Sequence, residues 1–342
     1  MASTTGSSVA AAPGTPARAS SDAAVPASLT ELAALEAARD EKRELLERAA
    51  QVAAQGLSRG KGLPAGCTPT DLPALLRRYY WSEPAAEVLG HDPAELAALA
   101  LGHLRLAEVR PQGAATVDVE RAADGRAVVR IITDDMPFLV DSVTAEVVRQ
   151  GIALAHVVHP IVVVTRGVTG RIEAFCDSAE AGACGPGALT ESWMAVVLDG
   201  PLDDEAAADL VAGLRTVLAD VRAVDEDAQR MRARVMDLAE RLEQHPGAAG
   251  AEDPADDPAE AAALLRWLAD GSFVFLGARD VDLAGGRGRA RATERPVPGT
   301  GLGVLRSDTD MGAAAGRLPE AARAPEQHLM TVTKADARST VH

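Results

Sequence analysis

Hydrophobic and polar positions follow different patterns in successive parts of the chain. From 28 to 106, apolar residues recur at helical spacing in an Ala- and Leu-rich segment with breaks at Pro64, Pro73, Pro84 and Pro93, which predicts several short helices. From 107 to 224, alternating apolar and polar residues predict strands with two amphipathic helices. A charged helix and an acidic linker follow over 225–257, and a helix with strand-like runs over 258–342 predicts the start of a second domain. Residues 1–27 are of low complexity and are predicted to be disordered.

The segment 107–224 has the element order of an α+β domain. The runs "ATVDVE" and "AVVRIIT" flank the turn residues "ADG" and predict a hairpin. Helices are predicted over 138–150 and 203–223, and Pro160 inside a long strand-like run predicts a bulge or an edge position. The order β-α-β-β-α predicts a two-layer sandwich of ferredoxin-like type with both helices on one sheet face. The alternative, a doubly wound sheet, needs more alternating strand-helix units than this segment has.

Composition excludes several classes of partner. The chain has 34 Lys and Arg against 50 Asp and Glu, a net charge of −16, which disfavours nucleic acid and anionic membranes as partners. No apolar run reaches the roughly 18 residues of a membrane-spanning helix, and the N-terminus lacks the features of a secretory signal. Cys67, Cys176 and Cys184 match no zinc spacing, so we interpret them as reduced thiols of a cytoplasmic protein.

The strongest candidate site is the turn "TDDMPF", which joins the strand "AVVRIIT" to the first predicted helix. Asp134 and Asp135 could perform acid–base chemistry or hold a metal. Alternatively, one of them caps the helix, with Pro137 near its first position and Phe138 after it. We favour capping because no nucleophile, base or metal partner stands at a useful spacing. The turn is therefore predicted to be a structural or regulatory corner, and an interface candidate, that performs no chemistry.

Other candidate motifs carry weaker signals. His156 and His159 are three residues apart in a strand, so they point to opposite faces and cannot share one metal. The run "RRYYW" over 77–81 could bind a nucleotide, but a helix corner that packs on the next domain is favoured. Glycine runs at 285–288 and 299–303 do not follow a strand and open a helix, as a dinucleotide fingerprint does, and nothing indicates that Lys334 is desolvated. No catalytic, cofactor-binding or metal site is predicted in this chain.

A series of motifs resembles the N-terminal part of the large bacterial NAD-dependent glutamate dehydrogenases. The motifs are, in order, "TDDMPFLVDSVTAEVVRQGIALAHVVHPIVVVTR", "ESWMAVV", "LLRWLADGSFVFLGARD", "GLGVLR" and "TKADARSTVH". The resemblance covers about 70–342 and implies ACT-type domains here, with the NAD-binding catalytic domain much later in a very long polypeptide. It also implies a cytoplasmic homo-oligomer assembled through N-terminal domains, with an amino acid as a candidate effector. The chain ends at His342 directly after a strand-like run, as a piece cut inside a second ACT-like domain would.

Within that resemblance, "DMPFLV" is similar to the ACT turn written Asp-x-Pro-Gly-Leu-Leu. Asp135, Pro137, Leu139 and Val140 match, whereas Phe138 stands at the glycine position. Glycine lets a ligand approach the backbone closely, so Phe138 argues against amino-acid binding at this turn. Two functions are compatible with the sequence: a regulatory and assembly region of an oxidoreductase, inactive by itself, and a stand-alone amino-acid sensor. A catalytic domain in its own right has no supporting residues.

Overall fold

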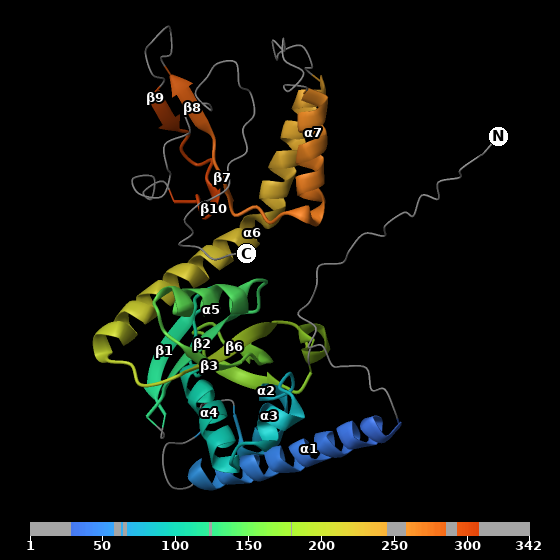
Figure 1. Ribbon diagram of the computed structural model, residues 1–342, viewed down its shortest axis with the longest axis vertical. Helices are drawn as coiled ribbons and strands as arrows, with labels where there is room; N and C mark the ends of the chain where they lie inside the picture. Colours follow the sequence, from blue (N-terminus) through green and yellow to red (C-terminus); the bar gives the residue numbers. More distant parts are fainter. Residues whose placement is uncertain are drawn as a thin grey trace, which may run out of the picture.

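The computed structural model describes residues 29–57, 63, 67–122, 125–178, 180–244, 258–284 and 293–307. In Figure 1, a central sheet lies between two groups of helices, and the long helix α6 runs from this body toward a smaller C-terminal unit. No helix of the described residues is long and apolar enough to cross a membrane.

Short helices cover the N-terminal part, as the proline pattern predicts. Three of the four predicted breaks lie at helix starts: Pro73 stands in the first turn of α2, Pro84 is the N-cap of α3, and Pro93 opens α4. Asp92 caps α4 and forms a capping box with Glu95, a favourable helix start. The fourth predicted break, Pro64, lies outside the described residues. The helices are α1 Leu29–Leu57, α2 Leu72–Tyr79, α3 Ala85–Leu89 and α4 Pro93–Leu106.

The main sheet is built around β6, with strand order β1-β2-β6-β4-β5 and β3 also paired to β6. The predicted hairpin is confirmed, because β1 pairs antiparallel with β2. β3 and β4 follow one another along the same edge of β6. His159 and Pro160 interrupt the strand between them, and the Pro160 carbonyl accepts a hydrogen bond from the Trp193 N–H at 2.9 Å. The register on β6 is the same on both sides of this interruption, from Val158↔Ala195 to Ile161↔Ser192, so the bulge predicted at Pro160 is wrong. The alternative, an edge position, agrees with β3, which pairs with β6 alone among the described strands. The strands are β1 Thr116–Arg121, β2 Ala127–Asp134, β3 Leu154–Val158, β4 Ile161–Arg166, β5 Ile172–Cys176 and β6 Ala188–Leu198.

Both faces of this sheet are covered. Helices α5 (Leu139–Arg149) and α6 (Asp204–Gln244) share one hydrophobic cluster with alternate residues of β2 and β6. The N-terminal helices share a second cluster with the opposite residues of those strands, including Trp193. Period-two alternation has this result, because successive side chains of a strand point to opposite faces. The α+β class is confirmed, and the N-terminal helices add a third layer to the two that the sequence predicts.

Helix α6 differs from the prediction of two helices separated near 224. It is one continuous helix of 41 residues, because neither Gly nor Pro interrupts the sequence there and its apolar stripe continues through Val224 to Met231. Beyond 225, Met231 shares the cluster of the sheet with Leu302 of β10 (Leu302–Gly303), which pairs with β7 (Gly277–Ala278). The last turns of α6 pack on α7 (Pro258–Trp267).

The C-terminal unit is described only in part. β7 pairs with β10, and β8 (Val281–Ala284) pairs with β9 (Thr293–Pro296). After α7, Asp270 and Gly271 leave helical geometry, with φ of 90° at Gly271, a conformation that suits a glycine at a helix end. The glycine run 285–288 and the whole of 308–342, including Lys334 and His342, lie outside the described residues.

Candidate functional site

Asp134, the last residue of β2, lies in an ion-pair network and not at the start of α5. Asp134 accepts hydrogen bonds from Arg110 Nη2 at 2.6 Å and forms an ion pair with Arg222 Nη1 at 2.7 Å. The N-cap residue of α5 is Phe138, and the helix begins at Leu139. The capping role predicted for this region is therefore wrong for Asp134, because two arginines from distant segments compete for its oxygens. Asp135 is exposed, and its backbone N–H donates to the Thr190 carbonyl at 3.0 Å.

A second carboxylate lies directly beside Asp134. Glu191 of β6 is its cross-strand neighbour in register and is fully buried. Arg110 donates to Glu191 Oε1 from Nε at 3.0 Å and from Nη2 at 2.7 Å, and the same Nη2 also reaches Asp134. Like charges opposite each other in a sheet are destabilising. The guanidinium of Arg110, itself buried, therefore holds the two carboxylates together.

Further donors saturate Glu191. Arg166 of β4 donates from Nε to Oε1 at 2.6 Å and from Nη2 to Oε2 at 2.8 Å, and Trp193 Nε1 donates to Oε2 at 3.0 Å. Burial by itself raises the pKa of Glu191, but these hydrogen bonds and the two guanidinium charges bring it below the ordinary value. The pKa of Asp134 is lowered in the same way, with Arg110 and Arg222 outweighing burial. Both groups are therefore anions at neutral pH. We name this group, Arg110, Asp134, Arg166, Glu191 and Arg222, the sheet-end cluster.

The sheet-end cluster is unsuited to acid–base catalysis. A general base needs a free lone pair within reach of substrate and a pKa near the working pH, whereas both carboxylates here face guanidinium groups and have lowered pKa values. In the part of the chain that the structure describes, no group of three or more acidic, His or Cys side chains could hold a metal ion. The arrangement instead joins β2, β6, β4, α6 and the segment before β1.

Phe138 has an uncommon backbone conformation. Its φ is 67° and its ψ is 7°, in the left-handed region, and it is the one non-glycine residue with positive φ among those described. L-residues other than glycine are strained in this region, which explains why glycine suits this position of the turn. The phenylalanine ring packs, half-buried, against the cluster beneath α5 and α6. The position that the turn resemblance singled out thus carries a backbone constraint. Pro137 lies one residue before the N-cap.

A second buried carboxylate lies further along α6. Asp227 is 1% exposed. Its Oδ2 accepts from the Gly303 backbone N–H at 2.8 Å and from Arg306 Nε at 3.0 Å, and its Oδ1 accepts from Arg230 at 2.9 Å. Arg234 on the same helix donates to the Thr300 carbonyl at 2.8 Å. We name Asp227 with Arg230, Gly303 and Arg306 the junction cluster, because it attaches the C-terminal unit to α6.

The remaining candidates have structural partners. His156 Nε2 lies 3.1 Å from Glu83 and His159 Nε2 lies 2.6 Å from Ser192 Oγ, so the two histidines hold different elements, as their spacing predicts. In the "RRYYW" run, Tyr79 is buried and its hydroxyl lies 2.5 Å from His103 Nδ1. Burial, with the charge of Arg130, lowers the pKa of His103 to about 3. The helix-corner interpretation of this run agrees with these contacts.

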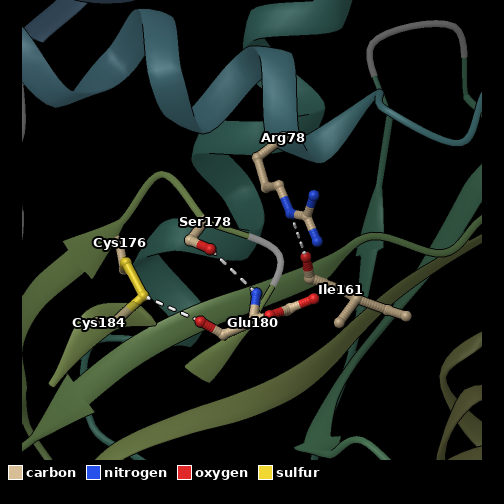
Figure 2. The surroundings of a disulfide bond; sticks show 6 residues. All are labelled: Arg78, Ile161, Cys176, Ser178, Glu180 and Cys184. Atoms are coloured by element: carbon tan, nitrogen blue, oxygen red, sulfur yellow. Dashed lines mark hydrogen bonds between the residues drawn. A yellow bond between two sulfur atoms is a disulfide. The ribbon is translucent and has the colours of Figure 1, made fainter. Parts of the chain in front are cut away.

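Two of the three cysteines are bonded to each other. Cys176 at the end of β5 and Cys184 in the short 3-10 turn η2 (Ala181–Cys184) form a disulfide, with Cα atoms 5.9 Å apart (Figure 2). The prediction of three reduced thiols is therefore wrong for this pair. The loop from β5 to β6 folds back over β4 and β6, a juxtaposition that sequence spacing does not reveal. Cys67 is free and buried.

Sequence reasoning missed most of both clusters. Arg110, Arg166 and Glu191 lie far apart in the chain, and each by itself resembles an ordinary surface residue. One signal was present: the strand "ESWMAVV" begins with Glu191 on the same face as Trp193, and a buried tryptophan two residues from a carboxylate indicates that the carboxylate is buried too. Asp227 carries no such signal, because its environment depends on a segment that follows an acidic linker.

Comparison with known proteins finds relatives of the part of the chain that contains this sheet. Residues 75–214 match the family model described as glutamate dehydrogenase, ACT1 domain. The matched segment, which contains most of the main sheet, is thus similar to the ACT1 domain of glutamate dehydrogenases. It is 34% identical over 213 residues to the NAD-specific glutamate dehydrogenase of Mycobacterium tuberculosis, covering 60% of this chain and 12% of that protein. It is 30% identical over 223 residues to the NAD-specific glutamate dehydrogenase of Halomonas elongata, covering 63% and 13%.

These matches confirm the resemblance to an N-terminal region of the NAD-dependent glutamate dehydrogenases. The matched part of the chain spans about an eighth of the length of these two relatives. The sheet-end cluster lies mostly inside the ACT1 match at 75–214, since four of its five members belong to it and only Arg222 lies beyond. The junction cluster lies wholly beyond the match.

Proposed function

We propose that this chain is the regulatory and assembly region of an NAD-dependent glutamate dehydrogenase, a cytoplasmic enzyme that deaminates L-glutamate oxidatively to 2-oxoglutarate and ammonia. The ACT1 match together with the similarity to NAD-specific glutamate dehydrogenases carries this proposal. The chain by itself is proposed to be inactive. A stand-alone amino-acid sensor is not favoured, because the relatives are enzymes and a strained Phe138 occupies the position of the turn at which a ligand would approach the backbone.

The described residues do not fit NAD. A dinucleotide site places a glycine-rich turn between a strand and a helix, with the pyrophosphate at the helix N-terminus. The run 299–303 lies in a turn that leads into β10, and no helix follows in the described part. NAD is therefore proposed to bind elsewhere in a longer polypeptide, and no step of the chemistry is assigned to this chain.

The strand order supports a ferredoxin-like ACT sandwich as the fold of the central unit. β2 and β3 both run antiparallel to β6 on its two sides, so they are parallel to each other, and α5 connects them. The edge position beside β2 is filled by β1, which precedes it in the chain. We propose that homo-oligomers form through this unit and its N-terminal helices. An amino-acid effector is proposed to act through such contacts, and not at the turn 134–138.

The proposal is tested by assaying reduction of NAD by glutamate in two proteins, this 342-residue chain and the product of a longer reading frame that contains it. We expect turnover in the longer product and none in the chain. In the longer product, an Arg110→Leu substitution should disturb assembly, measured by light scattering, with little effect on turnover of the molecules that still assemble. Glutamate-dependent NAD reduction by the 342-residue chain alone would overturn the proposal.

A further inference from the structure

The disulfide loop stands apart from the core that defines the fold. It connects β5 to β6, and Cys176 and Cys184 are both partly exposed. Gly185 and Gly187 have positive φ values of 93° and 85°, and a side chain added at either would meet no atom within 4 Å. These two glycines therefore lie on the open side of the loop, whereas η2 contacts β4 and β6.

Figure 2 shows the loop lying below α2, whose residue Arg78 reaches down to the sheet. Arg78 Nε donates to the Ile161 carbonyl at 2.9 Å. The preceding Arg77 forms an ion pair at 3.4 Å with Asp177, the residue directly after Cys176. A change in the position of Cys176 would therefore move Asp177 and affect the ion pair that joins α2 to the end of β5. Within the loop, the Glu180 N–H donates to Ser178 Oγ at 3.1 Å.

The third cysteine does not compete with this pair. Cys67 is 8% exposed. Its pKa is raised to about 11, chiefly by burial and further by Asp71. Thiol exchange requires an accessible thiolate, so Cys67 is unreactive in the folded chain. The chain therefore contains one two-thiol unit that small molecules can reach.

We propose that Cys176 and Cys184 are a reversible modification site, at which a low-molecular-weight disulfide oxidises the pair and a cellular dithiol reduces it. Disulfides in cytoplasmic proteins are generally transient or regulatory, so the inference rests on the proposed function for its cytoplasmic setting. The geometry does not depend on that setting: Cys176 and Cys184 lie on one loop, are partly exposed and are at bonding distance. Oxidation fastens η2 to the end of β5, and with it the position of Asp177 beneath α2.

The exchange needs only the two protein thiols and the small disulfide. The thiolate of one cysteine attacks a sulfur of the small disulfide, forming a mixed disulfide and releasing one small thiol. The second cysteine, as thiolate, attacks the protein sulfur of the mixed disulfide, forming the Cys176–Cys184 bond and releasing the second small thiol. Two electrons pass from the protein thiols to the oxidant, and the two protein protons end on the two released thiols.

The test equilibrates the 342-residue chain in reduced and oxidised glutathione at a series of ratios, then alkylates free thiols and measures the mass. We expect Cys176 and Cys184 to become protected together, with half-oxidation inside the range of ratios used, while Cys67 is alkylated only after unfolding. Two outcomes overturn the proposal: a pair that stays bonded in the most reducing buffer, which is a permanent structural bond, and a pair that never oxidises.

Hydrogen exchange supplies a second readout on the same samples. Reduction should speed amide exchange in the loop 177–187 at least tenfold, and should speed exchange in α2 to a smaller extent, with β2 unchanged. Equal exchange in both states would overturn the regulatory consequence. A Cys184→Ser variant should stop at the mixed disulfide with one added glutathione, and Cys67→Ala serves as the matched control that titrates like the parent. These measurements do not use enzyme activity, so their failure is distinguishable from failure of the proposed function.

Discussion

The sheet-end cluster and the junction cluster both neutralise buried carboxylates with arginine, but they differ in how much water reaches the arginines. At the sheet end, the side chains of Arg110 and Arg166 are 0% and 3% exposed. At the junction, those of Arg306 and Arg230 are 44% and 68% exposed. Ion pairs exposed to solvent are screened and contribute little, whereas breaking a buried pair leaves an unpaired charge. We therefore expect loss of an arginine to cost more stability in the sheet-end cluster than in the junction cluster.

The largest effect is expected from Arg110→Leu. The substitution leaves Glu191 and Asp134 opposite each other on neighbouring strands with one guanidinium bridge removed. We expect a loss of about 3–5 kcal/mol in the free energy of unfolding, measured by urea denaturation. Arg105→Leu, at an exposed arginine on α4, is the control and should change stability by no more than about 0.5 kcal/mol. A loss below about 1 kcal/mol for Arg110→Leu would remove the distinction between the clusters.

Acid should weaken the sheet-end cluster in a defined direction. The folded-state pKa values of Glu191 and Asp134 lie below their ordinary values, so their ionisation stabilises the fold above the unfolded pKa of about 4. That stabilisation is lost as the pH falls through the folded values. At neutral pH, Glu191→Gln should be less stable than the parent by roughly 2 kcal/mol.

The difference in the free energy of unfolding between the parent and Glu191→Gln should become smaller as the pH is lowered from neutrality through about 4. The measurement is urea denaturation of both proteins at each pH. Protonation of His103, whose pKa is about 3 in the folded chain, weakens both proteins equally and cancels from the comparison. A gap that stays constant down to the acid limit would show that the charge of Glu191 is not the stabilising property.

At the junction, Asp227→Ala should act locally. The Gly303 N–H and the Arg306 guanidinium lose their shared acceptor, so we expect a cost of about 1–2 kcal/mol that is confined to docking of the C-terminal unit. Hydrogen exchange should become faster over 302–306 and remain unchanged in β6. Because Arg306 is exposed, molar salt should reproduce part of this effect in the parent. Asp280→Ala, which removes an exposed partner of Arg234, is the control with a smaller effect. Faster exchange in β6 would contradict the separation of the two clusters.

The smallest effect tests the turn beside the sheet-end cluster. Phe138→Ala and Phe138→Gly both remove the ring, but glycine alone relieves the left-handed backbone. The glycine variant should therefore be more stable than the alanine variant by roughly 0.5–1 kcal/mol, after allowance for its greater unfolded-state entropy. Thermal unfolding of the two variants side by side measures the difference. Equal stabilities would mean that the strain at Phe138 is negligible.

The sequence predicted the features that depend on neighbouring residues. The hairpin of β1 and β2, the edge position beside Pro160 and the helix α5 within a residue of its predicted start and end follow from alternation, turn residues and proline chemistry. The continuity of α6 was missed, because an amphipathic stripe does not record where its partner changes from the sheet to α7. The chemistry at Asp134 was misassigned, because a cap is a local interaction and Arg110 and Arg222 are distant in sequence. The disulfide was missed for another reason: Cys176 and Cys184 are only eight residues apart, but the lack of a zinc spacing was interpreted as three reduced thiols.

Because α6 is continuous, it fixes the rotation of the junction cluster about the helix axis relative to the sheet-end cluster, as well as the distance between the two clusters. The helix has 41 residues and is therefore about 60 Å long, at 1.5 Å and about 100° per residue. Arg222 serves the sheet end and Asp227 serves the junction, on one uninterrupted helix. Inserting a single residue between them would swing the C-terminal unit by about 100° around the helix axis, whereas inserting seven would return it to within about 20° of its original bearing. The continuous helix thus sets the orientation of the C-terminal unit, and an insertion series between these two positions would measure that dependence directly.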